Sequence, residues 1–235
     1  MRTLCSSDFL DLWERGSRLH PLDRGLLALN AALADTPDES LADWPLGRRN
    51  RALAELQSAC FGPRFCGWTA CPQCGEKLEF EMDGGAILHP DNGPGADGPI
   101  VVNGQAFRLP TSRDLALAAR EADSGLAVVR LLESCRLQDA APRAWTPEEI
   151  EQIEERLALA DPMAETRLTL DCPKCGHRWE EALDLAVFLW AEIEARARRL
   201  LLEIHTLAAA YGWTEPEILA LSDRRRASYL EMVRP

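Results

Sequence analysis

The chain has 235 residues, eight of them cysteine, and a formal net charge of −12. This length allows one sizeable domain or two small ones. Nucleic-acid binders need a basic surface to neutralise phosphates, so the acidic balance argues against such a partner. No stretch approaches the roughly 18 consecutive apolar residues of a membrane span. The N-terminus is charged too early for a secretory signal. We therefore expect a cytoplasmic protein without a membrane partner, whose cysteines stay reduced.

Helical periodicity dominates the N-terminal region. Apolar residues recur at helical spacing from Ser7 to about Ala34, with a break at His20-Pro21. A turn over "DTPDES" precedes a second helix from about Pro45 to Cys60, with Asp43 as its cap. The face of the first segment that we expect to be buried comprises Phe9, Leu10, Trp13, Leu26, Leu27, Ala28 and Leu33.

The middle of the chain combines strand and turn signals. Apolar residues at positions 78, 80 and 82 alternate with glutamates, which is the period of a half-buried strand. The stretch from Asp83 to Pro99 is rich in Gly, Pro and Asp and predicts a long surface loop. Asn103-Gly104 lies between two apolar runs and predicts a two-residue hairpin turn.

Capping signals mark the later helices. Thr111 or Ser112 begins one helix, with Asp114 near its positive end. Another runs from about residue 126 to 137, and Thr146 with Glu149 forms a capping box for a third. The longest helix is expected over residues 185–211, ending at a glycine. Two short helices follow, after a capping box at residues 214 and 217 and a cap at residue 222.

Two copies of Cys-Pro-X-Cys-Gly carry the clearest chemistry. Cys71 and Cys74 form one pair, and Cys172 and Cys175 form the other. Two thiolates at this spacing can face one ion, and the following glycine permits the positive φ that closes such a turn. A structural zinc ion takes four ligands in a tetrahedron. We interpret the pairs as two halves of one structural Zn²⁺ site, each on its own hairpin.

A redox function is the main alternative for these cysteines. A thioredoxin-like Cys-X-X-Cys lies at a helix N-terminus, and one copy suffices. Here the residues after each pair have a strand pattern, and two matching copies favour one shared site. Whether Cys66 substitutes as a ligand, or His177 supports the site, stays open. The basic residues that we expect to moderate the charge of the bound thiolates are Lys77, Lys174 and Arg178.

The remaining sequence shows no catalytic constellation. It has no Ser-His-Asp order, phosphate-binding glycine loop or metalloprotease histidine pair. We therefore expect neither an enzyme nor a small-molecule substrate. Arginine clusters at residues 196–199 and 224–226 have two interpretations: solvated helix faces paired with glutamates, or a docking surface for an acidic protein. The residues that we select as partner-binding candidates are Trp213, Arg224, Arg225 and Tyr229.

Beyond these patterns, the chain resembles a known family. The C-terminal run "FLWAEIEARARRLLLEIHTLAAAYGWTEPEILALSDRRRASYLEMV" is similar to the tail of baseplate and tail-assembly proteins. Those belong to T-even-type contractile phages and related contractile injection systems. The stretches "FRLPTSRDLA" and "FGPRFCGWTACPQCGEKLEFEMD" are similar to zinc-knuckle members of the family. The likeness extends from about Leu46 onward, but the loop at residues 91–99 and the extra cysteines have no counterpart.

The resemblance implies a non-enzymatic role in building a phage-like baseplate, with other baseplate or tail proteins as partners. It places the protein in the cytoplasm of a bacterial or phage-infected cell, or in the assembled particle. Two other functions remain open: a zinc-ribbon protein that binds nucleic acid or acts in transcription, and a thiol oxidoreductase.

We expect an α+β fold, mostly helical, with a split four-cysteine zinc ribbon of two β-hairpins and a C-terminal helical unit. The regions that we expect are an N-terminal helical region (1–62), a first zinc knuckle with β-hairpins (63–110), a helical insertion (111–163), a second zinc-knuckle hairpin (164–185) and a three-helix unit (186–235).

Overall fold

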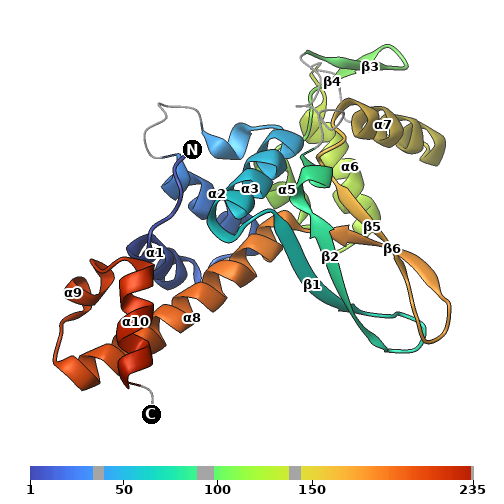
Figure 1. The fold of residues 1–235 in the computed structure, drawn as a ribbon. Coiled ribbons are helices and arrows are strands. Elements are labelled where there is room, and N and C mark those ends of the chain that lie inside the picture. The colour runs from blue at the N-terminus through green and yellow to red at the C-terminus, as the bar shows by residue number, and fades with distance from the viewer. Residues whose placement is uncertain (34–39, 89–97, 138–143, 234–235) are drawn as a thin grey trace.

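The computed structural model describes residues 1–33, 40–88, 98–137 and 144–233. It is a mostly helical α+β fold with three β-hairpins, as the sequence predicts (Figure 1). The long helix α8 (Leu185–Tyr211) runs from the hairpins β1–β2 and β5–β6 to the C-terminal helices, and α1, α2, α3 and α10 pack against it. No helix of the described ranges combines the length and the apolar character needed to cross a bilayer.

One apolar core joins the N-terminal helices to α8 and the C-terminal unit. Its helices are α1 (Ser6–Gly16), α2 (Pro21–Ala32), α3 (Leu46–Phe61) and α8. Gly16 allows a close approach, because a Cβ atom there would lie 2.2 Å from the ring of Trp190. The fully buried side chains of this core include Leu12, Leu29, Leu53, Leu56, Phe65, Leu189 and Ile193.

The predicted break between the first two helices is confirmed. The imidazole Nδ1 of His20 accepts a hydrogen bond from the amide of Leu22 at 3.3 Å and caps α2. The predicted Asp43 cap is wrong: α3 begins after Pro45, and Asp43 belongs to a short 3-10 helix, η1 (Leu41–Asp43), where it pairs with Arg113. Residues 35–39 of the predicted turn lie outside the described ranges.

Strand β2 (Lys77–Asp83) confirms the alternating pattern, and it pairs antiparallel with β1 (Arg64–Ala70). The long loop predicted next begins with a short helix, α4 (Gly84–Ile87), and residues 89–97 lie outside the described ranges. Strands β3 (Ile100–Val102) and β4 (Gln105–Phe107) form the predicted tight hairpin. Its turn residues Asn103 and Gly104 both have positive φ, 50° and 76°.

A second apolar cluster lies away from the main core. It combines β3 and β4 with α6 (Ser124–Cys135) and α7 (Pro147–Ala160), whose Thr146 capping box is confirmed. The buried residues of this cluster are Ile100, Val102, Phe107, Leu109, Leu132, Cys135, Ile153 and Leu157. The five-region division of the chain stays a prediction.

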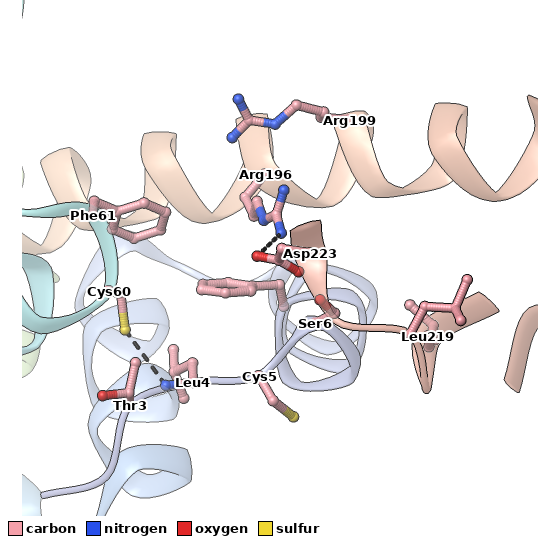
Figure 2. A pocket seen from close by; sticks show the side chains of 12 residues that line it. Thr3, Leu4, Cys5, Ser6, Cys60, Phe61, Arg196, Arg199, Leu219 and Asp223 are labelled. Atoms are coloured by element: carbon pink, nitrogen blue, oxygen red, sulfur yellow. Dashed lines mark hydrogen bonds and ion pairs between the residues drawn. The ribbon is translucent and has the colours of Figure 1, made fainter. Parts of the chain in front are cut away.

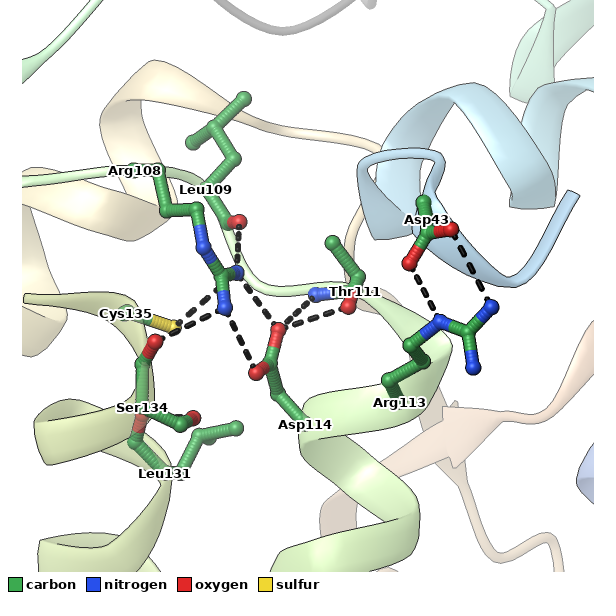
Figure 3. Close-up of polar contacts among 9 residues, drawn as sticks. All are labelled: Asp43, Arg108, Leu109, Thr111, Arg113, Asp114, Leu131, Ser134 and Cys135. Carbon is green, nitrogen blue, oxygen red and sulfur yellow. Dashed lines mark hydrogen bonds and ion pairs between the residues drawn. The ribbon is translucent and has the colours of Figure 1, made fainter. Parts of the chain in front are cut away.

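Helix α5 (Ser112–Ala118) is attached to this cluster through a buried carboxylate (Figure 3). Asp114 accepts two hydrogen bonds from the guanidinium of Arg108, at 2.6 and 2.8 Å. The same carboxylate accepts from the amide and hydroxyl of the N-cap residue Thr111. Although desolvation alone would raise the pKa of Asp114, the Arg108 and Thr111 donors outweigh it and hold that pKa well below its usual range.

The C-terminal helices follow the predicted punctuation. Helix α8 ends before Gly212, whose φ of 70° stops it. Helices α9 (Glu215–Leu219) and α10 (Asp223–Val233) then complete the three-helix unit. The hydroxyl of Ser222 accepts from the amide of Arg225 at 3.3 Å, which confirms the predicted cap of the last helix.

Candidate metal centre

Two hairpins of the same design present the cysteine pairs. The first is β1–β2, and the second is formed by β5 (Thr166–Asp171) and β6 (Arg178–Leu183). In each connecting turn the first cysteine donates its amide to the carbonyl five residues on, and its own carbonyl accepts from the glycine amide. These bonds are Cys71–Glu76 2.8 Å, Gly75–Cys71 2.8 Å, Cys172–His177 2.8 Å and Gly176–Cys172 2.9 Å.

The glycines explain the shared turn geometry. Gly75 and Gly176 both have φ of 71°, a left-handed conformation that costs glycine little because it has no Cβ atom. The turn leaves the two Sγ atoms of each pair within 4.8 Å of each other. The local sequence thereby produces two equivalent half-sites about a hundred residues apart in the chain.

The fold brings the two half-sites together. All four cysteine Sγ atoms lie within 4.8 Å of one another. Each buried first cysteine meets the exposed second cysteine of the other hairpin: Cys71 Sγ lies 3.7 Å from Cys175 Sγ, and Cys74 Sγ lies 3.6 Å from Cys172 Sγ.

These sulfur distances fit a metal ion. Four sulfurs at about 2.3 Å from a central zinc stand about 3.8 Å apart in a tetrahedron. A disulfide would instead need about 2.05 Å, and all eight cysteines are free. The cluster could therefore hold one metal ion such as zinc, with Cys71, Cys74, Cys172 and Cys175 as its ligands.

Backbone amides polarise the thiols. Desolvation by burial raises the pKa of Cys172, but hydrogen bonds from the amides of Cys175 and Lys174, together with the neighbouring sulfurs, outweigh it and lower that pKa to about 7. A hydrogen bond from the His177 amide lowers the pKa of Cys175, but desolvation and the other three cysteines outweigh it and raise the pKa of Cys175 to about 12. Four thiols this close cannot all ionise without a cation, which a metal ion supplies.

Two polar contacts tie the hairpins together beside the sulfurs. The ammonium of Lys174 lies 2.8 Å from a carboxylate oxygen of Glu76, in the opposite turn. The hydroxyl of Thr69 donates to Glu181 at 2.6 Å, and the Trp179 indole donates to the same carboxylate oxygen at 3.2 Å. Glu76, Thr69 and Glu181 were not predicted from the sequence, because neither motif alone indicates which residues meet across the hairpins.

The side chains of the other two residues considered for the site are not among its ligand atoms. Among the described residues, the group of ligand atoms includes neither Cys66 nor His177. Cys66 is exposed on β1, opposite Glu81. The His177 ring stacks on Trp179, with centroids 5.9 Å apart, and its main chain supports the second turn.

The surroundings of the pairs differ from those of a redox motif. A reactive Cys-X-X-Cys obtains its low pKa from a helix N-terminus. Here β2 and β6 follow the two pairs. A shell of four thiolates leaves no position for water, so an ion bound by all four cysteines would be structural rather than catalytic.

The tail candidates fall into two kinds. Trp213 and Tyr229 are half-buried and contact each other, with ring centroids 4.9 Å apart, and Tyr211 stacks on Trp213 at 4.6 Å. Arg224 and Arg225 are exposed on α10. The third arginine of that run, Arg226, is instead buried and paired with Glu203 and Asp223.

The other arginine cluster borders a hollow of about 590 Å³ where the N-terminus, α3 and α8 meet the tail (Figure 2). Arg196 pairs there with Asp223 at 3.0 Å. Arg198 pairs with Glu194, one turn away on α8. These two contacts fit the interpretation of helix-face arginines paired with acids, while Arg199 lines the hollow.

Comparisons with known proteins add no relative. The chain matches no protein-family model, no curated protein and no solved structure. The cluster of four cysteines is therefore the main indication of function within the described residues.

Proposed function

We propose that this protein is a non-enzymatic structural or assembly component of a phage-like contractile injection baseplate, stabilised by one structural Zn²⁺ and acting through contacts with other baseplate or tail proteins. The observation that carries the structural part is the closed set of four sulfurs from two hairpins. The baseplate assignment is supported by the resemblance of the C-terminal run.

The hairpins need such an ion. Each is a sheet of only two strands, and isolated two-stranded hairpins are marginal in water. Their inward faces are only half-buried, so apolar burial contributes little to holding them together. A bound zinc contributes folding free energy directly, because its ligands are brought together only in the folded chain.

The zinc hairpin also fixes the start of the tail. Strand β6 ends at Leu183, and the carboxylate of Asp184 then accepts from the amides of Ala186 and Val187, at 2.9 and 3.1 Å. Helix α8 therefore begins directly at the hairpin and carries the three-helix unit that has the family resemblance. This connection supports a scaffold in which the metal orients a protein-binding tail.

Co-purification tests the proposal. The tagged chain is co-expressed with the products of its neighbouring genes, and we expect a stable complex with tail or baseplate subunits. The double variant Arg224→Glu/Arg225→Glu should weaken it about tenfold, because charge reversal at a contact repels the partner. The matched control, Arg120→Glu/Arg130→Glu, changes two exposed arginines outside the tail and should leave the complex intact.

Two outcomes would contradict the proposal. One is the absence of any complex with the neighbouring subunits. The other is salt-sensitive binding of the purified chain to DNA or RNA, which would favour the nucleic-acid function instead.

A further inference from the structure

A hollow of about 450 Å³ lies between the two zinc hairpins and the start of α8. The strand register shows that the inward faces of the hairpins line it: Gly67 and Phe80 are direct partners in β1–β2, and Leu168 lies opposite Glu181 in β5–β6. Val187, in the first turn of α8, also lines the hollow. The hairpins thus form the walls of a groove, which we call the inter-hairpin groove.

Both ends of the inter-hairpin groove are closed by contacts. At the hairpin tips, the four sulfurs and the Thr69–Glu181 hydrogen bond join the two walls. At the other end, Phe65 of β1 stacks on Phe188 of α8, with ring centroids 5.3 Å apart. These contacts fix the position of the two walls relative to each other and to α8.

The middle of the groove is apolar without belonging to a core. Phe80, Leu168 and Leu170 are half-buried, and they belong to neither apolar cluster of the described residues. At the edges, Trp68 is 67% exposed and Val187 is 49% exposed. A hollow lined mainly by apolar side chains is the kind of concave surface at which proteins bind ligands.

The charged residues of the groove all have one sign. Its lining, within the described parts of the chain, includes the carboxylates of Glu181, Asp184 and Glu192 but no Lys, Arg or His. Lys77 is near the rim but lies over the Trp68 ring, 5.3 Å from its centroid. A partner therefore needs apolar side chains for the floor and positive charges for the rim.

We propose that the inter-hairpin groove binds a segment of another protein in which apolar side chains are flanked by lysine or arginine. A second copy of this chain is a poor occupant, because each copy carries a net charge of −12 and the two would repel. This proposal shares with the proposed function the zinc-bound hairpins and the view that the partner is a protein. It places recognition at the zinc hairpins as well as at the tail.

Synthetic peptides test the groove independently of any baseplate. Three fluorescein-labelled 12-residue probes alternate Leu with Lys, Leu with Glu, or Ser with Lys, and fluorescence anisotropy measures their binding to the full zinc-loaded chain. The Leu/Lys peptide should bind at least about tenfold more tightly than either of the others, because only it satisfies both floor and rim.

Substitutions at two lining residues, the half-buried Glu192 and the exposed Val187, locate the site. Glu192→Lys on α8 should weaken Leu/Lys binding about fivefold and reduce the salt dependence of that binding, since an attractive carboxylate is replaced by a repulsive ammonium. Val187→Ser should weaken it by a similar factor through lost apolar contact. The matched controls Glu155→Lys and Leu159→Ser change an exposed glutamate and an exposed leucine on α7, and should leave binding unchanged.

Three results would overturn the inference. The first is equal binding of the three peptides, and the second is Leu/Lys binding that neither groove variant weakens. The third is a zinc-loaded dimer, seen by sedimentation, that Val187→Ser dissociates, because the groove would then hold a second copy. If the chain forms the subunit complex but does not bind the Leu/Lys peptide selectively, only the groove proposal is refuted. If it binds the peptide selectively but forms no complex with the neighbouring subunits, only the baseplate assignment is refuted.

Discussion

Replacing Arg226 by methionine should loosen the C-terminal unit from the rest of the fold. The Arg226 side chain is 1% exposed, and its guanidinium donates to Glu203 of α8 at 2.7 Å, to Asp223 at 2.5 Å and to the Ser6 hydroxyl at 3.3 Å. It thereby joins α10, α8 and the first residue of α1. Methionine keeps much of the side-chain volume but removes every one of these donors.

The expected loss of unfolding free energy depends on how exposed the two acidic partners of Arg226 are. Asp223 is 72% exposed and regains water when its donor is removed, so its pair contributes little. Glu203 is only 16% exposed and is left partly desolvated. Removing one member of a buried ion pair costs about 3–5 kcal/mol, and we take about 3 kcal/mol here because of this partial exposure. For a chain of this size, each kcal/mol lowers Tm by about 3 °C, which gives about 9 °C.

Urea unfolding followed by circular dichroism, with a thermal melt beside it, measures this loss. Arg225→Met is the matched control, because the neighbouring arginine is exposed and its replacement should change the free energy of unfolding by less than about 0.5 kcal/mol. Equal stabilities of the two variants would refute the claim that the ion pairs of Arg226 hold the C-terminal helices against α8.

Two further substitutions test the attachment of the middle helices. Asp114→Asn should lower the free energy of unfolding by about 2 kcal/mol at neutral pH. Because the folded-state pKa of Asp114 is depressed, its contribution is complete above the ordinary pKa of about 4 and is lost as pH falls below it. The difference in unfolding free energy between Asp114→Asn and wild type, measured by urea unfolding from pH 7 to pH 2, should therefore narrow as the pH falls. A difference that stays constant over this range would contradict the Arg108 pairing. In Gly47→Ala, the new Cβ would lie 1.7 Å from a carboxylate oxygen of Asp161, so Asp161 must move. The free energy of unfolding should therefore fall by about 2 kcal/mol. An unchanged urea midpoint would contradict this packing.

Local signals predicted much of the fold because they act within a few residues. The bounds of α8, the Asn103-Gly104 turn and the Thr146 capping box depend on dihedral preferences and on neighbouring hydrogen bonds. The two cysteine turns are equally local, which is why each half-site was visible in the sequence. The prediction that the two half-sites form one site rests on the preference of zinc for four ligands.

Features that depend on distant residues were not predictable in the same way. Asp is a residue type that often caps helices, but Asp43 instead pairs with Arg113, which lies 70 residues away in the chain. Arg226 is indistinguishable from its exposed neighbours until α8 supplies Glu203. Strand β1 showed no alternation, because Cys66 and Trp68 are apolar on its exposed face. The inter-hairpin groove likewise exists only once two hairpins with separate sequences face each other.

Zinc content per chain tests the central claim most directly. Elemental analysis of the purified protein should give about one zinc for the wild type and for Cys66→Ser, the control outside the four-sulfur group. Cys71→Ser and Cys172→Ser should each lose that zinc and destabilise both hairpins, since three thiolates cannot close the tetrahedron. Two zinc ions per chain, metal retained in each single variant, or a metal other than zinc would contradict a single shared zinc site.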